Sequence, residues 1–374
     1  MLNDIALDSR TGRMRTERRS GLTDRGVRRT LRRAFRTRPE GHGSPERALR
    51  AASNARGTDP VDRIHILVLN YNGKELLAEC LPSIVVAAKR SRRECVVSVV
   101  DNGSTDDSLA FLAHFMSDVG VIRSENLGLA SFNAISIQST DRTLILLNND
   151  IRLAENAIDP LVDALEKHPD ALFAAPLCWN REGTVYEGMR TRVRSRFGLV
   201  QGMCRVPGYE TSIHQADLTA SAGPVLAVNR AKFVALGGYD PLYFPGRIED
   251  LDLGYRAWLA GARGYYVPES VAFHHGFATF EKTFGSAGCE KLAIRNTFLF
   301  VWKNLRGARL IAHAFWTPIR LGYAIATGRR AFVAGFFEAL GRFRQAIDAR
   351  RGVRDRFGAA WGENQEAFFA RFRW

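Results

Sequence analysis

The stretch IHILVLNYNG, residues 64–73, decides the fold of this 374-residue chain. Residues 64–69 form an almost continuous apolar run, which is typical of a buried strand. Residues 70–73 are polar and end in glycine, so they predict a turn. Residues 74–88 then repeat apolar side chains at helical spacing, on the face made by Leu76, Leu77, Leu81 and Ile84. The sequence therefore predicts a strand, a turn and a helix.

The same alternation continues to residue 150. Strand patterns at residues 96–100, 119–122 and 144–147 alternate with helical patterns at 105–115 and 127–139. Ser104 or Thr105 is the expected N-cap of the first of these helices. Such alternation predicts an α/β fold with a Rossmann-like, doubly wound, mostly parallel sheet, which binds ligands at the carboxyl ends of its strands.

The remaining sequence has a looser pattern. Residues 154–167 and 250–259 predict helices and residues 172–175 predict a strand. Residues 177–220 show no regular pattern, although arginines occupy alternate positions from 190 to 196. After residue 276 the chain is expected to be helical and basic to its end.

The formal net charge of +14 is unevenly distributed. Residues 1–60 carry 15 basic and 7 acidic side chains, residues 61–285 carry 22 and 26, and residues 286–374 carry 16 and 6. The first segment has too few apolar groups to offset the entropy of ordering. We expect a disordered Arg-rich arm over 1–60, a globular α/β domain over 61–285, and a basic amphipathic helical region over 286–374.

Composition excludes several classes of protein. A hydrophobic content of 46% and an aromatic content of 10% exclude global disorder. The five cysteines are widely separated and form no CxxC pair, so we expect neither a disulfide framework nor a zinc ribbon, and a reducing compartment is the default expectation. No apolar run reaches the ~18 residues of a membrane-spanning helix. We expect no secretory leader, and an organellar transit peptide is the minor alternative.

Two carboxylates follow predicted strands. Asp101 begins the turn DNGSTDDS and Asp150 ends LLNND. A carboxylate at a strand end can accept hydrogen bonds from a base or ribose, or bind a hard cation that bridges phosphates. The alternative is that Asp and Asn only form turns there.

A second acidic group begins a helix. Glu249, Asp250 and Asp252 lie within four residues after a loop of Gly, Tyr, Phe and Pro. The helix macrodipole favours acids at this position without any function, but Asp and Glu are also common general bases. His274 in VAFHHG is either a packed core histidine or a ligand.

Seven motifs in order give residues 64–304 a resemblance to the family 2 glycosyltransferases of the GT-A fold. The resemblance is to the rhamnosyltransferase-like branch that acts in bacterial cell-surface polysaccharide assembly. The motifs are ILVLNYNG (66–73), VVDNGSTDDS (99–108), ENLGLASFNAI (125–135), LLNND (146–150), GGYDPLYFPGRIEDLDLGYRAWLAG (237–261), VPESVAFHHG (267–276) and the RN pair at 295–296.

This resemblance implies roles for twelve residues. Asp250 would be the catalytic base, with Glu249 supporting it or binding the acceptor, and Asp150 and His274 would hold Mg²⁺ or Mn²⁺. The residues that would bind the nucleotide-sugar donor are Asn70, Tyr71, Asn72, Asp101, Asn126, Gly128, Asn133 and Asn149. Of these, Asp101 would bind the base and the 126–133 segment would close over the donor.

One position departs from the family pattern. Asn148 replaces the first acid of the DxD metal motif, which leaves Asp150 as the single firm carboxylate for a metal. The chain also lacks the QxxRW motif and spanning helices of processive relatives. The resemblance therefore implies inverting transfer of a single sugar from a donor such as dTDP-rhamnose or a UDP-hexose to a glycan or lipid-linked glycan acceptor.

The basic C-terminal region suggests where the protein works. Arginines alternate with aromatic and aliphatic residues over 286–350, as in helices that lie on an anionic membrane. We therefore expect a cytoplasmic protein, peripheral on the inner face of the plasma membrane. The alternative is that the apolar face packs on the α/β domain or on a second subunit, which keeps a homo-oligomer open.

Other classes of function remain as rivals. A pI near 10 also suits nucleic-acid binding, but the α/β domain is slightly acidic, so we expect no nucleic-acid partner. The remaining alternatives are a membrane- or nucleic-acid-binding protein on a decayed transferase fold, or a nucleotidyltransferase.

Overall fold

The computed structural model describes residues 6–7, 14–15, 61–276 and 278–374. The arm expected over residues 1–60 lies outside the described residues, except for β1 (Ala6–Leu7) and β2 (Met14–Arg15), which pair antiparallel. The expected disorder of this arm stays a prediction.

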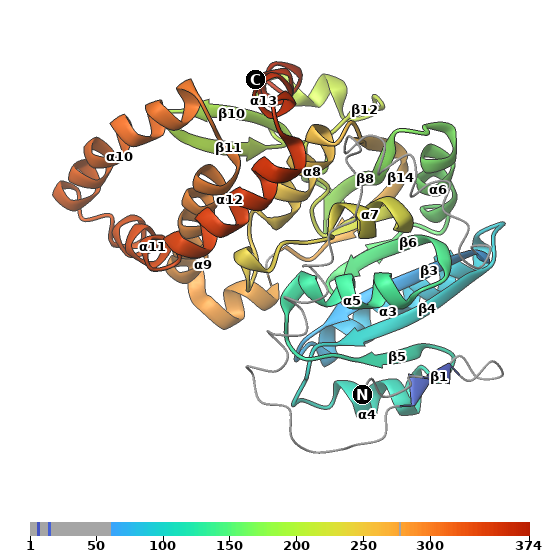
Figure 1. Ribbon diagram of the computed structural model, residues 1–374. Helices are drawn as coiled ribbons and strands as arrows, with labels where there is room; N and C mark the ends of the chain where they lie inside the picture. Colours follow the sequence, from blue (N-terminus) through green and yellow to red (C-terminus); the bar gives the residue numbers. More distant parts are fainter. Residues whose placement is uncertain (1–5, 8–13, 16–60, 277) are drawn as a thin grey trace.

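A ten-stranded sheet forms the centre of the described chain (Figure 1). The strands on its main path are β12 (Asp217–Leu218), β14 (Arg263–His274), β8 (Ala171–Asn180), β13 (Val225–Asn229), β6 (Asp141–Asn148), β3 (Val61–Asn70), β4 (Cys95–Asp101) and β5 (Gly120–Arg123), in that order. Two short strands, β7 (Ile151–Leu153) and β9 (Tyr186–Gly188), pair with β14 and β8. Strands β3 to β6 are parallel, whereas β13 runs antiparallel between β6 and β8. The expected mostly parallel α/β sheet is confirmed.

Helices flank the sheet. Those predicted at residues 74–88, 105–115, 127–139, 154–167 and 250–259 are present with shifted ends, whereas the helix Arg230–Leu236 and the short turns of helix at Tyr209–Ser212 and Pro241–Tyr243 were not predicted. The helices are α3 (Lys74–Arg90), α4 (Ser108–Phe115), η1 (Gly128–Ala130), α5 (Ser131–Gln138), α6 (Ile158–Lys167), η2 (Tyr209–Ser212), α7 (Arg230–Leu236), η3 (Pro241–Tyr243) and α8 (Glu249–Leu259). On α3, the predicted apolar face buries Leu77, Leu81 and Ile84 completely. Burial of such side chains contributes about 1.5–3 kcal/mol each.

The predicted cap of α4 is wrong. The helix begins at Ser108 with Asp107 as its N-cap, and no side chain there makes a capping bond. Ser104 and Thr105 lie earlier in the turn, where their backbone amides donate to Asp101 Oδ2 (3.2 Å) and Asn72 Oδ1 (2.7 Å). These side-chain acceptors hold the segment as a loop, so the helix begins later.

Residues 177–220 are more regular than the sequence predicts. β10 (Arg192–Arg196) and β11 (Leu199–Met203) form a hairpin around Phe197 and Gly198, both of which have positive φ. Two positive-φ residues suit a tight hairpin turn. The arginines at alternate positions therefore form the polar face of strand β10, and Val193 is fully buried on the opposite face of the same strand.

Strand β14 was not predicted from the sequence. It pairs parallel with β8, with a register shift between Val267 and Val271. Pro268 and Glu269 fall within this irregularity and interrupt the apolar pattern from which a strand is predicted. Its last residue, His274, reaches the same end of the sheet as Asp150.

The C-terminal residues form five helices that lie together beyond α8, away from the β4–β5 edge (Figure 1). They are α9 (Ala278–Asn304), α10 (Ala308–Ala326), α11 (Arg330–Gly341), α12 (Phe343–Phe357) and α13 (Ala360–Arg371). A kink at Gly285 (φ 66°) breaks α9 at the expected domain boundary, although the division into domains stays a prediction. None of the described helices has the length and apolar character needed to cross a membrane.

A buried carboxylate joins α8 to α9. Asp252 Oδ1 accepts hydrogen bonds from Tyr243 Oη (2.8 Å), Lys303 Nζ (2.7 Å) and Asn304 Nδ2 (2.7 Å). Arg256 Nε donates to the other oxygen at 2.6 Å. Burial alone would raise the pKa of Asp252, but Lys303 and Arg256 hold it well below its usual range. The network therefore contains an ionised carboxylate with its charge compensated.

Replacing Lys303 with Met should lower the free energy of unfolding by about 3 kcal/mol, because it leaves Asp252 and Asp240 short of a buried cation. Urea denaturation would measure the loss. The matched control is Arg351→Met, which breaks an exposed pair with Asp348 and should change stability by about 0.5 kcal/mol or less. Equal effects of the two substitutions would contradict the importance of the buried network.

Candidate active site

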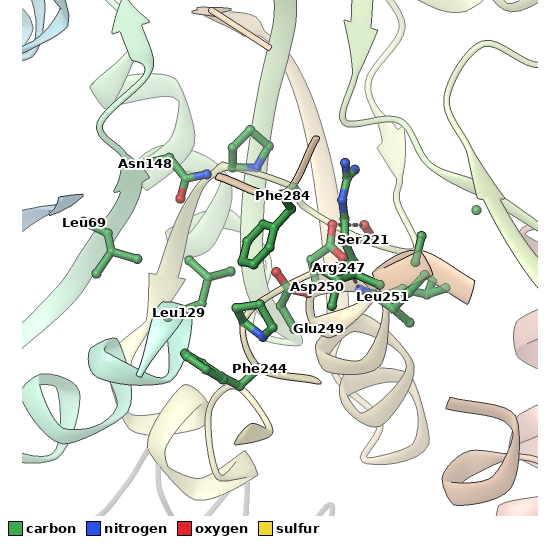
Figure 2. A pocket seen from close by; sticks show the side chains of 18 of the residues that line it. Leu69, Leu129, Asn148, Ser221, Phe244, Arg247, Glu249, Asp250, Leu251 and Phe284 are labelled. Carbon is green, nitrogen blue, oxygen red and sulfur yellow. Dashed lines mark hydrogen bonds between the residues drawn. The ribbon is translucent and has the colours of Figure 1, made fainter. Parts of the chain in front are cut away.

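A cavity of about 1170 Å³ opens at the carboxyl ends of β3 and β6 and extends past the start of α8 to α9 and α11. Eight of the twelve predicted site residues line it: Tyr71, Asn126, Gly128, Asn149, Asp150, Glu249, Asp250 and His274. The other four, Asn70, Asn72, Asp101 and Asn133, do not line it. Figure 2 shows Glu249 and Asp250 in the middle of the labelled lining residues. Asn148 lies to one side of this acidic pair, and Leu251 lies to the other.

Asn70 supports the cavity wall from behind. Its side chain is fully buried and its Oδ1 accepts from Asn149 Nδ2 at 2.7 Å. A Cβ at Gly73 would lie 2.1 Å from the same Asn149 nitrogen. The NYNG turn therefore requires glycine at its last position so that Asn149 can pack beside it.

Asn72 and Asp101 organise the turn after β4. Asn72 Oδ1 accepts from the backbone amides of Thr105 (2.7 Å) and Asp106 (3.3 Å). Asp101 is 2% exposed, and among the described residues its Oδ1 has no hydrogen-bond partner. A buried oxygen without a partner is costly, so Asp101 retains an acceptor that a ligand could satisfy.

Asn133 lies outside the cavity. Its side chain is buried and makes two hydrogen bonds with the backbone of Tyr239. Asn133 Nδ2 donates to the Tyr239 carbonyl (2.7 Å), and Asn133 Oδ1 accepts from the Tyr239 amide (2.9 Å). A Cβ at Gly238 would come within 2.1 Å of Asn133 Oδ1. The structure therefore gives this residue a bracing contact with the GGYD turn, where the sequence predicted contact with the donor.

Asp150, His274 and Glu187 form a line of charges on the cavity wall. His274 Nε2 lies 3.4 Å from Asp150 Oδ2, and His274 Nδ1 lies 2.7 Å from Glu187 Oε2. Burial lowers the pKa of His274, but the hydrogen bonds and charges of Asp150 and Glu187 outweigh it and raise the pKa to about 9. The imidazole is therefore cationic at neutral pH and bridges two carboxylates.

These residues offer part of a metal site. Asp150 Oδ1 is buried without a hydrogen-bond partner among the described residues, which is the state of a carboxylate oxygen available to a cation. Within the described ranges no group of three or more His, Cys, Asp and Glu side chains is placed to hold a metal ion. A cation at Asp150 would need further oxygen ligands from a bound diphosphate.

A strained loop delivers Glu249 and Asp250 to the cavity. Arg247 (φ 81°) and Ile248 (φ 74°) both adopt the left-handed region, which is unusual for a β-branched residue. Asn296 Nδ2 on α9 donates to the carbonyls of Tyr243, Gly246 and Arg247 at 2.8–2.9 Å. Because these hydrogen bonds from α9 hold the loop in place, Arg247 and Ile248 keep their strained backbone conformations at the start of α8.

Close packing of α8 then positions Asp250. A Cβ at Gly254 would lie 1.9 Å from the carbonyl oxygen of Ala220, so only glycine permits this approach. The contact brings the neighbouring Ser221 Oγ within 2.9 Å of Asp250 Oδ2, to which it donates. The Leu251 amide donates to Asp250 Oδ1 at 2.8 Å. Each carboxylate oxygen is thus held by one donor.

Glu249 lies in an environment that keeps its carboxyl protonated. Burial and the negative charge of Asp250 raise the pKa of Glu249 to about 8. Its Oε2 is buried without a hydrogen-bond partner among the described residues. At neutral pH the cavity therefore holds a protonated carboxyl that can donate a hydrogen bond, directly beside Asp250.

Several residues of this site were not predicted from the sequence. Glu187 and Ser221 lie in stretches without a motif, and only folding brings them to His274 and Asp250. Arg295 and Asn296 were recognised in the sequence as a motif. Their hydrogen bonds to the loop before α8 could not be predicted, because they depend on where α9 packs. Arg295 Nη2 adds a bond to the Phe244 carbonyl at 2.7 Å.

Comparison with known proteins shows what the chain resembles. Residues 65–217 match the family described as glycosyl transferase family 2. It is 29% identical over 239 residues to N-acetylglucosaminyl-diphospho-decaprenol L-rhamnosyltransferase of Mycobacterium tuberculosis (strains CDC 1551 / Oshkosh and ATCC 25618 / H37Rv). That alignment covers 57% of this chain and 76% of the relative.

Solved structures show more distant likenesses. The Staphylococcus aureus protein TarS 1-349 in complex with UDP-GlcNAc is 15% identical, with a TM-score of 0.48 and coverage of 83% of this chain and 91% of TarS 1-349. The mannosyltransferase PcManGT of Pyrobaculum calidifontis, with GDP-Man and Mn²⁺, is 14% identical, with a TM-score of 0.46 and coverage of 92% and 94%. GalNAc-T7, with UDP, GalNAc and Mn²⁺, is 20% identical with a TM-score of 0.45, and the match covers 57% of this chain but only 43% of GalNAc-T7.

Replacing Glu249 with Gln should change how stability depends on pH. The carboxyl is protonated in the folded protein up to a pH of about 8, whereas its ordinary pKa is 4.5. Folded wild-type protein therefore loses stability as the pH rises from about 4.5 to 8. The E249Q amide cannot ionise, so this variant should lose less stability between about pH 5 and pH 9 in urea denaturation.

Glu269→Gln is the matched control, because Glu269 is exposed on β14. Its unfolding free energy should follow the wild-type pH dependence. Parallel curves for E249Q and wild type would show that Glu249 is not held protonated.

Proposed function

We propose that this enzyme transfers one sugar, with inversion, from a nucleoside-diphosphate donor to a hydroxyl of a glycan or lipid-linked glycan in cell-surface polysaccharide assembly. We expect dTDP-rhamnose or a UDP-hexose as donor. The match of residues 65–217 to glycosyl transferase family 2 supports the proposal, as does the name of the mycobacterial relative, which specifies a rhamnosyl donor group and a diphospho-decaprenol acceptor. The observation that carries it is the oriented carboxylate of Asp250 in the same cavity as Asp150.

Asp250 acts as the general base in this proposal. Its two oxygens accept hydrogen bonds from Ser221 Oγ and the Leu251 amide, and each keeps lone pairs for a substrate hydroxyl. As Asp250 takes the proton, the acceptor oxygen bonds to the anomeric carbon and the bond from that carbon to the diphosphate oxygen breaks on the opposite face. The protonated Glu249 donates a hydrogen bond to a substrate oxygen beside the reacting hydroxyl.

Asp150 and His274 face the leaving group. Asp150 and His274 would hold Mg²⁺ or Mn²⁺, with the donor diphosphate completing the ligands, and the ion would supply Lewis-acid stabilisation of the leaving phosphate. His274 would bind the ion only as the neutral imidazole, so metal binding would release the proton that it otherwise carries. The partnerless Asp150 Oδ1 fits this role. Asp101 Oδ1 is the acceptor for the nucleotide base, and the turn at residues 70–72 lies along the nucleotide.

We also propose that α10 and α11 rest on an anionic membrane at the cytoplasmic face. One side of α10 exposes a stripe of large apolar residues at four-residue spacing: Ile311, Phe315, Ile319 and Tyr323. Ile311 is 72% and Phe315 is 63% exposed. The exposed Arg329 and Arg330 follow at the junction with α11, so basic groups come directly after the apolar stripe in the sequence.

Asp250→Asn should lower sugar transfer by at least about 100-fold while leaving nucleoside-diphosphate affinity within a few fold, because it removes the base and keeps the shape. Transfer would be measured with saturating donor and acceptor, and affinity by calorimetry. Asp118→Asn, in an exposed loop, is the control and should behave as wild type. Wild-type turnover by D250N would refute the assignment of the base.

Asp150→Ala should abolish the part of nucleotide binding that depends on metal. A thermal-shift panel of nucleoside diphosphates, each with Mg²⁺, with Mn²⁺ and with chelator, would identify the base and the ion together. The wild-type protein should be stabilised most by one nucleotide with metal, and D150A should lose that increment. Identical shifts with and without metal in both proteins would show that the metal role is wrong.

Vesicle flotation tests the membrane surface. Wild-type protein should float with anionic but not with neutral vesicles, and the double variant Ile311→Ser/Phe315→Ser should float less. Phe115→Ser is the matched control, because Phe115 on α4 is 76% exposed but lies far from α10 in the sequence and fold. The absence of wild-type protein from both kinds of vesicle would contradict the membrane proposal.

A further inference from the structure

The cavity does not end at Asp250. It continues to a wall formed by α9 and α11, where Lys291, Arg295, Glu338 and Arg342 line it. Three of these side chains are cationic and one is acidic, so this end of the cavity has an excess of positive charge. The opposite end, at Asp150 and Glu187, is rich in carboxylates.

Close packing of α9 against α11 determines the position of this wall. A Cβ at Gly335 would lie 2.8 Å from the carbonyl oxygen of Lys291, so glycine allows the helices to approach. One turn later Glu338 pairs with Lys291 Nζ (3.0 Å) and Arg295 Nη1 (2.7 Å). The single carboxylate is therefore shared by two cations.

Arg342 is the cation that this arrangement leaves without a carboxylate. Within the described residues no carboxylate oxygen lies within 4.0 Å of its guanidinium, which makes only long bonds to the carbonyls of Leu242 (3.4 Å) and Phe244 (3.3 Å). Burial lowers the pKa of Arg342, and the charge of Arg295 lowers it further, despite Glu338. A half-buried guanidinium in a cavity of excess positive charge favours an anionic ligand.

The rim beside this wall is apolar. Phe244 and Phe284 both line the cavity and are 39% and 40% exposed. Figure 2 shows Phe284 over the space between Asn148 and the acidic pair. On α11, Phe337 and Leu340 are exposed on the turns that carry Glu338 and Arg342. An anion bound here would therefore lie next to a surface suited to a hydrocarbon chain.

We propose that the α9–α11 end of the cavity binds the phosphate or diphosphate of an amphiphilic, lipid-linked acceptor, with Arg342 and Lys291 as its cationic ligands. This inference rests on the proposed glycosyl transfer and assigns its acceptor end. The planar guanidinium of Arg342 would bind two phosphate oxygens, and Lys291 would add a point charge. The acceptor sugar would then extend toward Asp250, and the lipid would leave over the aromatic rim.

Binding of farnesyl diphosphate to the full-length chain tests the inference. The protein is first saturated with its nucleoside diphosphate and metal, so that the donor site is filled, and affinity is measured by calorimetry. Arg342→Gln and Lys291→Gln should each weaken binding by about tenfold or more, since each removes a charge-assisted contact. Arg344→Gln, an exposed arginine outside the cavity, is the matched control and should bind as wild type.

Two further probes distinguish the source of the anion. Farnesol should bind much more weakly than farnesyl diphosphate, and inorganic pyrophosphate should bind more weakly than the lipid. Equal affinity for pyrophosphate and farnesyl diphosphate would overturn the lipid part of the inference. Unchanged affinity for farnesyl diphosphate in both R342Q and K291Q would overturn the anion site.

Nucleotide affinity separates this inference from the function on which it rests. R342Q and K291Q should bind the nucleoside diphosphate as wild type does, which also shows that the variants are folded. Nucleotide binding without any farnesyl diphosphate binding would overturn the acceptor site alone. Failure of wild-type protein to bind every nucleoside diphosphate would overturn the proposed glycosyl transfer itself.

Discussion

The ionised carboxylate of Asp252 is the interaction on which the active-site arrangement depends. It is fully buried on α8 and takes its compensating charge from Lys303 on α9 and from Arg256 on α8 itself. A buried charge without a partner is far more costly than one that is paired. The helix that carries Asp250 therefore cannot occupy its position unless α9 occupies its own.

The C-terminal helices consequently belong to the site. Asn296 and Arg295 bind the carbonyls of the loop before α8, and this clamp maintains the left-handed conformations of Arg247 and Ile248. On the other side, Gly254 presses α8 against Ala220 and brings Ser221 to Asp250. Strain, close packing and buried charge thus act on one short segment and fix the direction of one carboxylate.

The sequence predicts the first half of the fold well because its signals there are local. Residues 64–73 show a buried strand and its turn, and helical periodicity on α3 marks the face that is buried. The hairpin β10–β11 and the strand β14 were missed, since alternating arginines and an interrupting Pro268 hide their periods. Motifs identified Asp150 and Asp250, but they could not separate Asn126, which lines the cavity, from Asn133, which braces Tyr239. That distinction depends on contacts between residues more than 100 positions apart.

The connection between α8 and α9 also limits how this chain can be divided. The family-matched segment ends at residue 217, before Asp250 and before the partners of Asp252 on α9. A fragment ending at residue 285 would keep Asp240 and Asp252 without Lys303, and the loop before α8 without Arg295 and Asn296. Exchange of modules between relatives, by recombination or by design, would therefore have to keep residues 240–304 together.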